Sequence, residues 1–141
     1  MDDLNRGMAL NSDGTVAIVS RQSGAGLDLW RYNTDGSGTP VQLTTSGQTR
    51  GALNMSPEFS PNDQRIVFTT QELSESLDIM VINTNGTGLT NATASPDYSE
   101  VRPTWSPDGG RLAFERFDDE ASGFLQPGES PNWNIHVIAV P

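Results

Sequence analysis

The sequence contains no cysteine and no lysine, and it has a single histidine, His136. Without cysteine the chain can form no disulfide framework, no thiolate metal site and no cysteine nucleophile. Its 18 acidic residues outnumber its 8 basic residues, all of them arginine, which gives a net charge of −10. This balance argues against binding to nucleic acid or to an anionic membrane surface, because both require clustered cations.

Long apolar segments are also missing from the sequence. No run approaches the roughly 18 apolar residues of a membrane-spanning helix, and the acidic N-terminus MDDLNRGMAL lacks the apolar segment of a secretory signal. No stretch of ten or more residues has an apolar period of 3.6, so we expect essentially no helix. The 141 residues correspond to one domain or part of one, and the 14 glycines and 9 prolines predict many turns.

One unit recurs three times along the chain. A turn sequence precedes an apolar triplet in each copy, and the turns begin at Asn11, Ser60 and Ser106, which are 49 and then 46 residues apart. Further downstream, Leu27-Asp28-Leu29-Trp30 is matched by Leu77-Asp78-Ile79-Met80. Several landmarks recurring in the same order indicate an internal repeat.

Each unit is predicted to contain short strands separated by turns. The first strand ends at Leu10, Phe59 or Trp105, and the second contains the apolar triplet. In the third, successive side chains alternate between two faces, with Leu77, Ile79 and Val81 on one and Asp78, Met80 and Ile82 on the other. A weaker fourth strand ends at Thr44 and at Thr93 in the first two copies.

Four antiparallel strands in about 40–50 residues are typical of a β-propeller blade. A β-sandwich would also contain many short strands, but it would not repeat this set of motifs three times. We therefore predict an all-β protein of three four-stranded antiparallel propeller blades, spanning about 7–46, 55–95 and 101–141, with no evident last strand in the third.

The segments Pro57–Phe68 and Pro103–Phe114 resemble the TolB-type propeller repeat, also called the WD40-like or PD40 repeat. The first copy is degenerate, with Met8 in place of the proline, and Asn134-Ile135-His136 departs from the third-strand pattern. The resemblance implies a six-bladed propeller, of which three blades are half, and a periplasmic or extracellular setting. It implies no particular activity, because such repeats occur in scaffolds and in enzymes alike.

Three blades are fewer than the four to eight or so that usually close a propeller. Either the chain is a fragment of a longer propeller, or two copies close a six-bladed ring about a two-fold axis. The predicted partner is therefore a second copy of the chain or further blades, with another protein as a further possibility.

The long insertion of the third unit, residues 117–132, is a candidate partner-binding loop, since long loops on a rigid scaffold often carry binding function. Its alternative role is to fold Phe124 and Leu125 back onto the blade edge. The acidic cluster within it has the ligand type of a calcium site, but a solvated loop is the preferred interpretation. The candidate residues are Phe117, Asp118, Asp119, Glu120, Phe124, Leu125, Trp133 and His136.

Signals of catalysis are weak in this sequence. It contains no G-x-S-x-G nucleophile elbow, and His136 at a strand position is more typical of a structural role. We expect no catalytic residue, no metal and no cofactor, and we predict a non-catalytic binding or scaffold module. The alternatives are a fragment of a propeller attached to a prolyl-oligopeptidase-type hydrolase, or part of a carbohydrate-active propeller.

Overall fold

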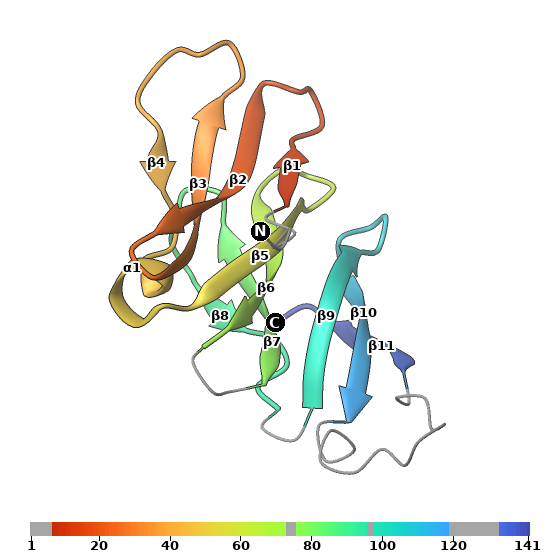
Figure 1. Cartoon of the computed structure of the whole chain (residues 1–141). Helices are drawn as coiled ribbons and strands as arrows, with labels where there is room; N and C mark the ends of the chain where they lie inside the picture. The colour runs from red at the N-terminus through yellow and green to blue at the C-terminus, as the bar shows by residue number, and fades with distance from the viewer. Residues whose placement is uncertain (1–6, 73–75, 96–97, 119–132) are drawn as a thin grey trace.

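The computed structural model describes residues 7–72, 76–95, 98–118 and 133–141, which form eleven strands and one short helix (Figure 1). The prediction of an all-β chain with essentially no helix is confirmed. No helix in these ranges is long and apolar enough to cross a membrane.

The strands fall into three consecutive groups, which we call blades. Blade 1 contains β1 (Met8–Leu10), β2 (Val16–Ser23), β3 (Gly26–Asn33) and β4 (Val41–Gln42). Blade 2 contains β5 (Leu53–Phe59), β6 (Arg65–Gln71), β7 (Leu77–Asn83) and β8 (Thr90–Asn91). Blade 3 contains β9 (Tyr98–Trp105), β10 (Arg111–Asp118) and β11 (Asn134–Ala139).

Neighbouring strands within each blade pair antiparallel. A single parallel bridge, between Leu27 and Leu53, connects the first two blades into one eight-stranded sheet. Blade 3 is a separate three-stranded sheet in the order β11-β10-β9. Figure 1 shows it on the side of β6 and β7 that lies away from blade 1.

The turns after the first strands are closed by their own side chains. The Ser60 and Ser106 hydroxyls accept hydrogen bonds from the backbone N–H of Arg65 and Arg111, both at 2.9 Å. The Ser106 hydroxyl and the Gly110 N–H also hydrogen-bond to Asp108, and they lower the pKa of its carboxyl. These local contacts explain why the turn sequence recurs with the blade.

The core consists of two apolar clusters, one at each contact between neighbouring blades. The first contains Ile18 and Leu29 from blade 1 and Phe68 from blade 2. The second contains Ile79 from blade 2 and Phe114 from blade 3. Blade 2 is therefore buried on both faces, which explains the solid apolar triplet of its second strand.

The fourth strands are shorter than predicted, because β4 ends at Gln42 and β8 at Asn91. The Thr44 hydroxyl instead accepts a hydrogen bond from the backbone N–H of Leu29 at 2.9 Å, and the Thr93 hydroxyl accepts one from Ile79 at 3.1 Å. A threonine side chain thus replaces the last ladder bond in both blades.

Helix α1 (Ser46–Arg50), which the sequence did not predict, connects blade 1 to blade 2. It ends at Gly51, whose φ of 73° lies in the left-handed region that favours glycine. Gly47 is buried against β3, and a Cβ at this position would lie 2.4 Å from the carbonyl oxygen of Leu27. Only glycine permits this close approach of helix and strand.

We expect Gly47→Ala to lower the free energy of unfolding by about 1–3 kcal/mol, because α1 would have to move away from β3. Urea unfolding followed by circular dichroism measures this change. Gly110→Ala is the control, since its new Cβ would meet no atom closer than 3.4 Å. Equal stabilities of the two variants would contradict the close contact.

Candidate functional site

The outer side of blade 3 exposes a row of apolar side chains. Residues directly opposite in an antiparallel pair share a face, and Phe114, opposite His136, faces blade 2. The alternate positions Ile135 and Val137 therefore lie on the other side, where they are 70 % and 59 % exposed. Trp133 lies two residues before Ile135 and is 49 % exposed.

We call this surface the open face of blade 3 (Phe117, Trp133, Ile135 and Val137). The Phe117 and Trp133 rings contact each other, with centroids 4.6 Å apart and planes tilted by 50°. The pair extends the row of Ile135 and Val137 toward the end of β10. The result is a continuous apolar strip along β11.

The repeat shows how the fold uses the corresponding face in the other blades. Ile79 and Val81 occupy in blade 2 the positions of Ile135 and Val137, and they are 0 % and 4 % exposed because blade 3 covers them. Leu29, the equivalent of Ile79 in blade 1, is 0 % exposed against blade 2. The open face of blade 3 is thus the third copy of a surface that is buried by a following blade in both other instances.

Blade 1 presents the complementary surface, which we call the open face of blade 1 (Met8, Leu10, Val19, Trp30 and Tyr32). Its members pair across β1, β2 and β3, on the side opposite the first core cluster. Met8 and Leu10 are 68 % and 57 % exposed, whereas Phe59, the equivalent of Leu10 in blade 2, is 8 % exposed.

A cation and a buried donor also lie on the open face of blade 1. The Arg21 guanidinium lies over the Trp30 ring, 5.1 Å from its centroid, and donates a hydrogen bond to the Tyr32 hydroxyl at 3.0 Å. The Trp30 Nε1–H is buried and has no acceptor among the described residues. The Arg21 guanidinium therefore lies among the apolar side chains of this face.

The predicted partner-binding residues are separated by the fold. Phe117 and Trp133 lie together on the open face of blade 3. His136 points to the opposite side, where it stacks on Phe114 with ring centroids 6.0 Å apart. Asp118 ends β10, and its side chain lies outside the described residues, as do Asp119, Glu120, Phe124 and Leu125.

Sequence reasoning missed the apolar members of the two open faces, Ile135, Val137, Met8 and Leu10. A signal for them was present, because Ile135 aligns with the third-strand residue Ile79 once the repeat is known. The signal was incomplete, since an apolar residue in a strand does not reveal whether a neighbouring sheet covers it.

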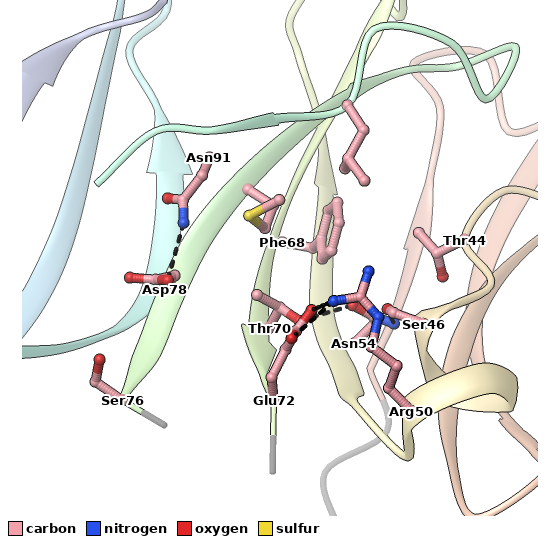
Figure 2. Close-up of a pocket in the computed structure, with 12 residues that line it drawn as sticks. Thr44, Ser46, Arg50, Asn54, Phe68, Thr70, Glu72, Ser76, Asp78 and Asn91 are labelled. Atoms are coloured by element: carbon pink, nitrogen blue, oxygen red, sulfur yellow. Dashed lines mark hydrogen bonds and ion pairs between the residues drawn. The ribbon is translucent and has the colours of Figure 1, made fainter. Parts of the chain in front are cut away.

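A cavity of about 270 Å³ lies between the end of blade 1 and the outer strands of blade 2 (Figure 2). Its polar groups pair with one another: Arg50 Nη1 bonds both carboxylate oxygens of Glu72 at 3.1 and 3.0 Å, and the Asn91 amide donates to Asp78 at 2.9 Å. Within the described residues, no three acidic or histidine side chains are grouped so as to hold a metal ion.

No family model and no curated protein matches this sequence. Among solved structures, a protein described as TolB from Agrobacterium tumefaciens superposes with a TM-score of 0.72 at 21% identity, over 93% of this chain and 44% of that chain. The chain has the fold of part of a TolB-like β-propeller.

Two further structures place the fold in a wider group. TolB from Acinetobacter baumannii matches with a TM-score of 0.66 and 13% identity over 99% of this chain and 31% of that chain. Oligogalacturonate lyase from Vibrio parahaemolyticus matches with a TM-score of 0.65 and 9% identity over 96% of this chain and 36% of that chain. The chain spans less than half the length of each of these proteins, and identities this low show the fold alone.

Proposed function

We propose that the chain is a non-catalytic binding module whose open blade faces associate with a second copy to close a propeller ring. The observation that carries this proposal is the exposure of Ile135 and Val137 on a face whose equivalent apolar residues, Leu29, Ile79 and Val81, are 0 %, 0 % and 4 % exposed. An apolar face of this kind gains roughly 25 cal/mol for each Å² removed from water.

The repeat supports a second copy of this chain as the partner that covers the two open faces. The open face of blade 3 corresponds to the side of blade 2 that contacts blade 3. The open face of blade 1 corresponds to the opposite side of blade 2, which contacts blade 1. Blade 3 of one copy can therefore pack on blade 1 of the other as blade 2 packs on blade 3. A two-fold axis generates both contacts at once and leaves no open face, and two-fold symmetry is the commonest in oligomers.

We expect the purified chain to have about twice its monomer mass of 15.2 kDa in solution. Light scattering at micromolar concentration measures this directly. A well-folded particle of 15.2 kDa would contradict self-association.

Three substitutions test the faces themselves. Ile135→Asp and Leu10→Asp each place a charge on one of the two open faces, so each is expected to return the mass to that of one chain. Leu89→Asp is the matched control, because Leu89 is 53 % exposed and belongs to neither face. A dimer that survives both open-face variants, or that Leu89→Asp dissociates, would contradict the proposed contact.

A propeller segment of an enzyme is the second candidate function, because one matched fold is that of an oligogalacturonate lyase. In such a protein, further blades of the same chain would cover the two open faces. The wild-type chain would then stay monomeric, and it would associate only when the missing blades were supplied as a separate polypeptide. Comparing the masses with and without that polypeptide separates the two candidates.

A further inference from the structure

The contact between blades 2 and 3 brings together two acidic residues where the contact between blades 1 and 2 has an acid and an amide. Asp78 is the repeat equivalent of Asp28, since each is the second residue of its third-strand motif. Glu100 is the equivalent of Asn54, three residues before the proline of its first strand. The exchange of an amide for a carboxylic acid changes which hydrogen bonds are available.

At the contact of blades 1 and 2, the amide serves as a donor. Asn54 Nδ2 donates to Asp28 Oδ1 at 3.2 Å and to the Leu27 carbonyl at 2.9 Å, and Asn54 Oδ1 accepts from the Thr70 hydroxyl at 2.9 Å. Asp28 is 0 % exposed and Asn54 is 2 % exposed. The amide thus joins the two blades through a buried N–H to a carboxylate.

At the contact of blades 2 and 3, that donor is missing. Asp78 Oδ2 accepts from Asn91 at 2.9 Å, and Glu100 Oε1 accepts from Arg116 Nε at 3.0 Å. The other two oxygens, Asp78 Oδ1 and Glu100 Oε2, are buried without a hydrogen-bond partner in the described part of the chain. Glu100 is 0 % exposed, so bulk water cannot solvate its carboxyl group.

The surroundings of Glu100 favour its neutral form. Burial raises the pKa of its carboxyl above the ordinary value of 4.5, and the charge of Asp78 raises it further. The Thr93 hydroxyl and the Arg116 guanidinium act in the opposite direction. The charged or titratable described groups around the pair are Asp78 on β7, Arg116 on β10, and Tyr98 on β9, whose ring lies 4.8 Å from the Arg116 guanidinium.

We propose that Glu100 binds a proton while Asp78 is ionised, and that its Oε2–H donates to Asp78 Oδ1. This hydrogen bond replaces the one from Asn54 Nδ2 to Asp28 Oδ1 in the preceding repeat. The proton comes from solvent and returns to it, so no other co-reactant is required. The contact between blades 2 and 3 is therefore sensitive to pH.

The direction of this effect follows from the pKa of Glu100. Because the folded-state pKa is raised above the ordinary value of 4.5, the folded chain holds the proton at pH values where the unfolded chain has lost it. The contribution of Glu100 to stability is greatest below about pH 4.5, and it is lost as the pH rises through the folded-state pKa.

A carboxyl-carbon NMR titration of the whole chain, labelled with ¹³C-glutamate, tests the proton directly. We expect the Glu100 midpoint to lie above 4.5 and to fall in Asp78→Asn, where the neighbouring negative charge is gone and an amide donor replaces it. Glu115, which pairs with Arg102 at the surface, is the internal control and is expected to keep its midpoint in Asp78→Asn. A Glu100 midpoint at or below 4.5, or one that Asp78→Asn leaves unchanged, would overturn the proposal.

The same titration with added calcium chloride distinguishes a proton from a cation between the two acids. An unchanged Glu100 midpoint is expected. A midpoint lowered by calcium would show that the pair holds a metal ion instead, and would overturn the proposal.

Thermal unfolding provides a second readout. Glu100→Gln supplies a permanent N–H donor, so its Tm is expected to exceed that of the wild type at neutral pH, with the difference disappearing toward pH 4.5. Glu115→Gln removes the same charge from a surface pair and is expected to show no such convergence. A Glu100→Gln variant less stable than the wild type at neutral pH would overturn the proposal, and a variant that fails to fold would leave the wild-type and Asp78→Asn titrations to decide.

Discussion

Phe68→Ala and Phe114→Ala are each expected to lower the free energy of unfolding by about 3–5 kcal/mol. Phe68 is 1 % exposed in the cluster between blades 1 and 2, and Phe114 is 2 % exposed in the cluster between blades 2 and 3. Each substitution removes an aromatic ring from a contact between two sheets, which cannot collapse around the cavity because both are held by ladder hydrogen bonds. Urea unfolding followed by circular dichroism measures both losses.

Ile135→Ala is the control for these two substitutions. Its side chain is 70 % exposed, so we expect a change within about 0.5 kcal/mol under conditions where the chain is monomeric. A loss below about 1 kcal/mol for Phe114→Ala would mean that blade 3 does not share a core with blade 2.

The second large effect is expected for Asp28→Ala. The Asp28 carboxylate is completely buried and accepts hydrogen bonds from the Gly47 and Gln48 backbone N–H groups at 2.9 and 3.0 Å. It also accepts from the Thr44 hydroxyl at 2.9 Å and from the Asn54 amide at 3.2 Å. Each buried donor left unpaired costs about 1–3 kcal/mol, so we expect a total loss of about 3 kcal/mol or more.

Asp78→Ala is the matched control for Asp28→Ala, because Asp78 holds the same position in the next blade. Its Oδ2 accepts from the exposed Asn91 amide, which water can solvate after the substitution. In the pair proposed above, its Oδ1 also accepts from Glu100, so the comparison is made at a pH above the Glu100 titration midpoint, where that donor has lost its proton. We expect a loss of about 1 kcal/mol or less. Equal losses for the two variants in urea unfolding would contradict the role of Asp28 in joining β3, α1 and β5.

Much of the fold could be predicted because its signals are local. The turns at Ser60 and Ser106 are closed by bonds within five residues, so their sequence alone predicts them. The alternation along Leu77–Asn83 likewise predicted the two faces of β7, with Ile79 and Val81 against blade 3 and Ile82 against blade 1.

The short helix and the ends of the fourth strands could not be predicted in the same way. Helix α1 exists because Gly47 allows it to contact β3 and because its N–H groups reach the carboxylate of Asp28, about twenty residues earlier. β4 ends at Gln42 because the Thr44 side chain takes over the bond to Leu29. Both depend on contacts between distant segments, which leave no periodic pattern in the sequence.

The sequence by itself determined the repeat, the strand types, the turns and the resemblance to the TolB-type propeller, because turn chemistry and side-chain alternation act over a few residues. Only the tertiary structure decided which faces are covered. Ile79 and Ile135 occupy equivalent positions in equivalent strands, yet one is buried and the other is 70 % exposed. Likewise, Asn54 and Glu100 acquire their roles only when stacked blades bring Asp28 and Asp78 to them. Whether a side chain is buried, and whether it is charged, depends on the residues that face it from the adjacent sheet. Those residues are distant in the chain, so the local sequence does not reveal them.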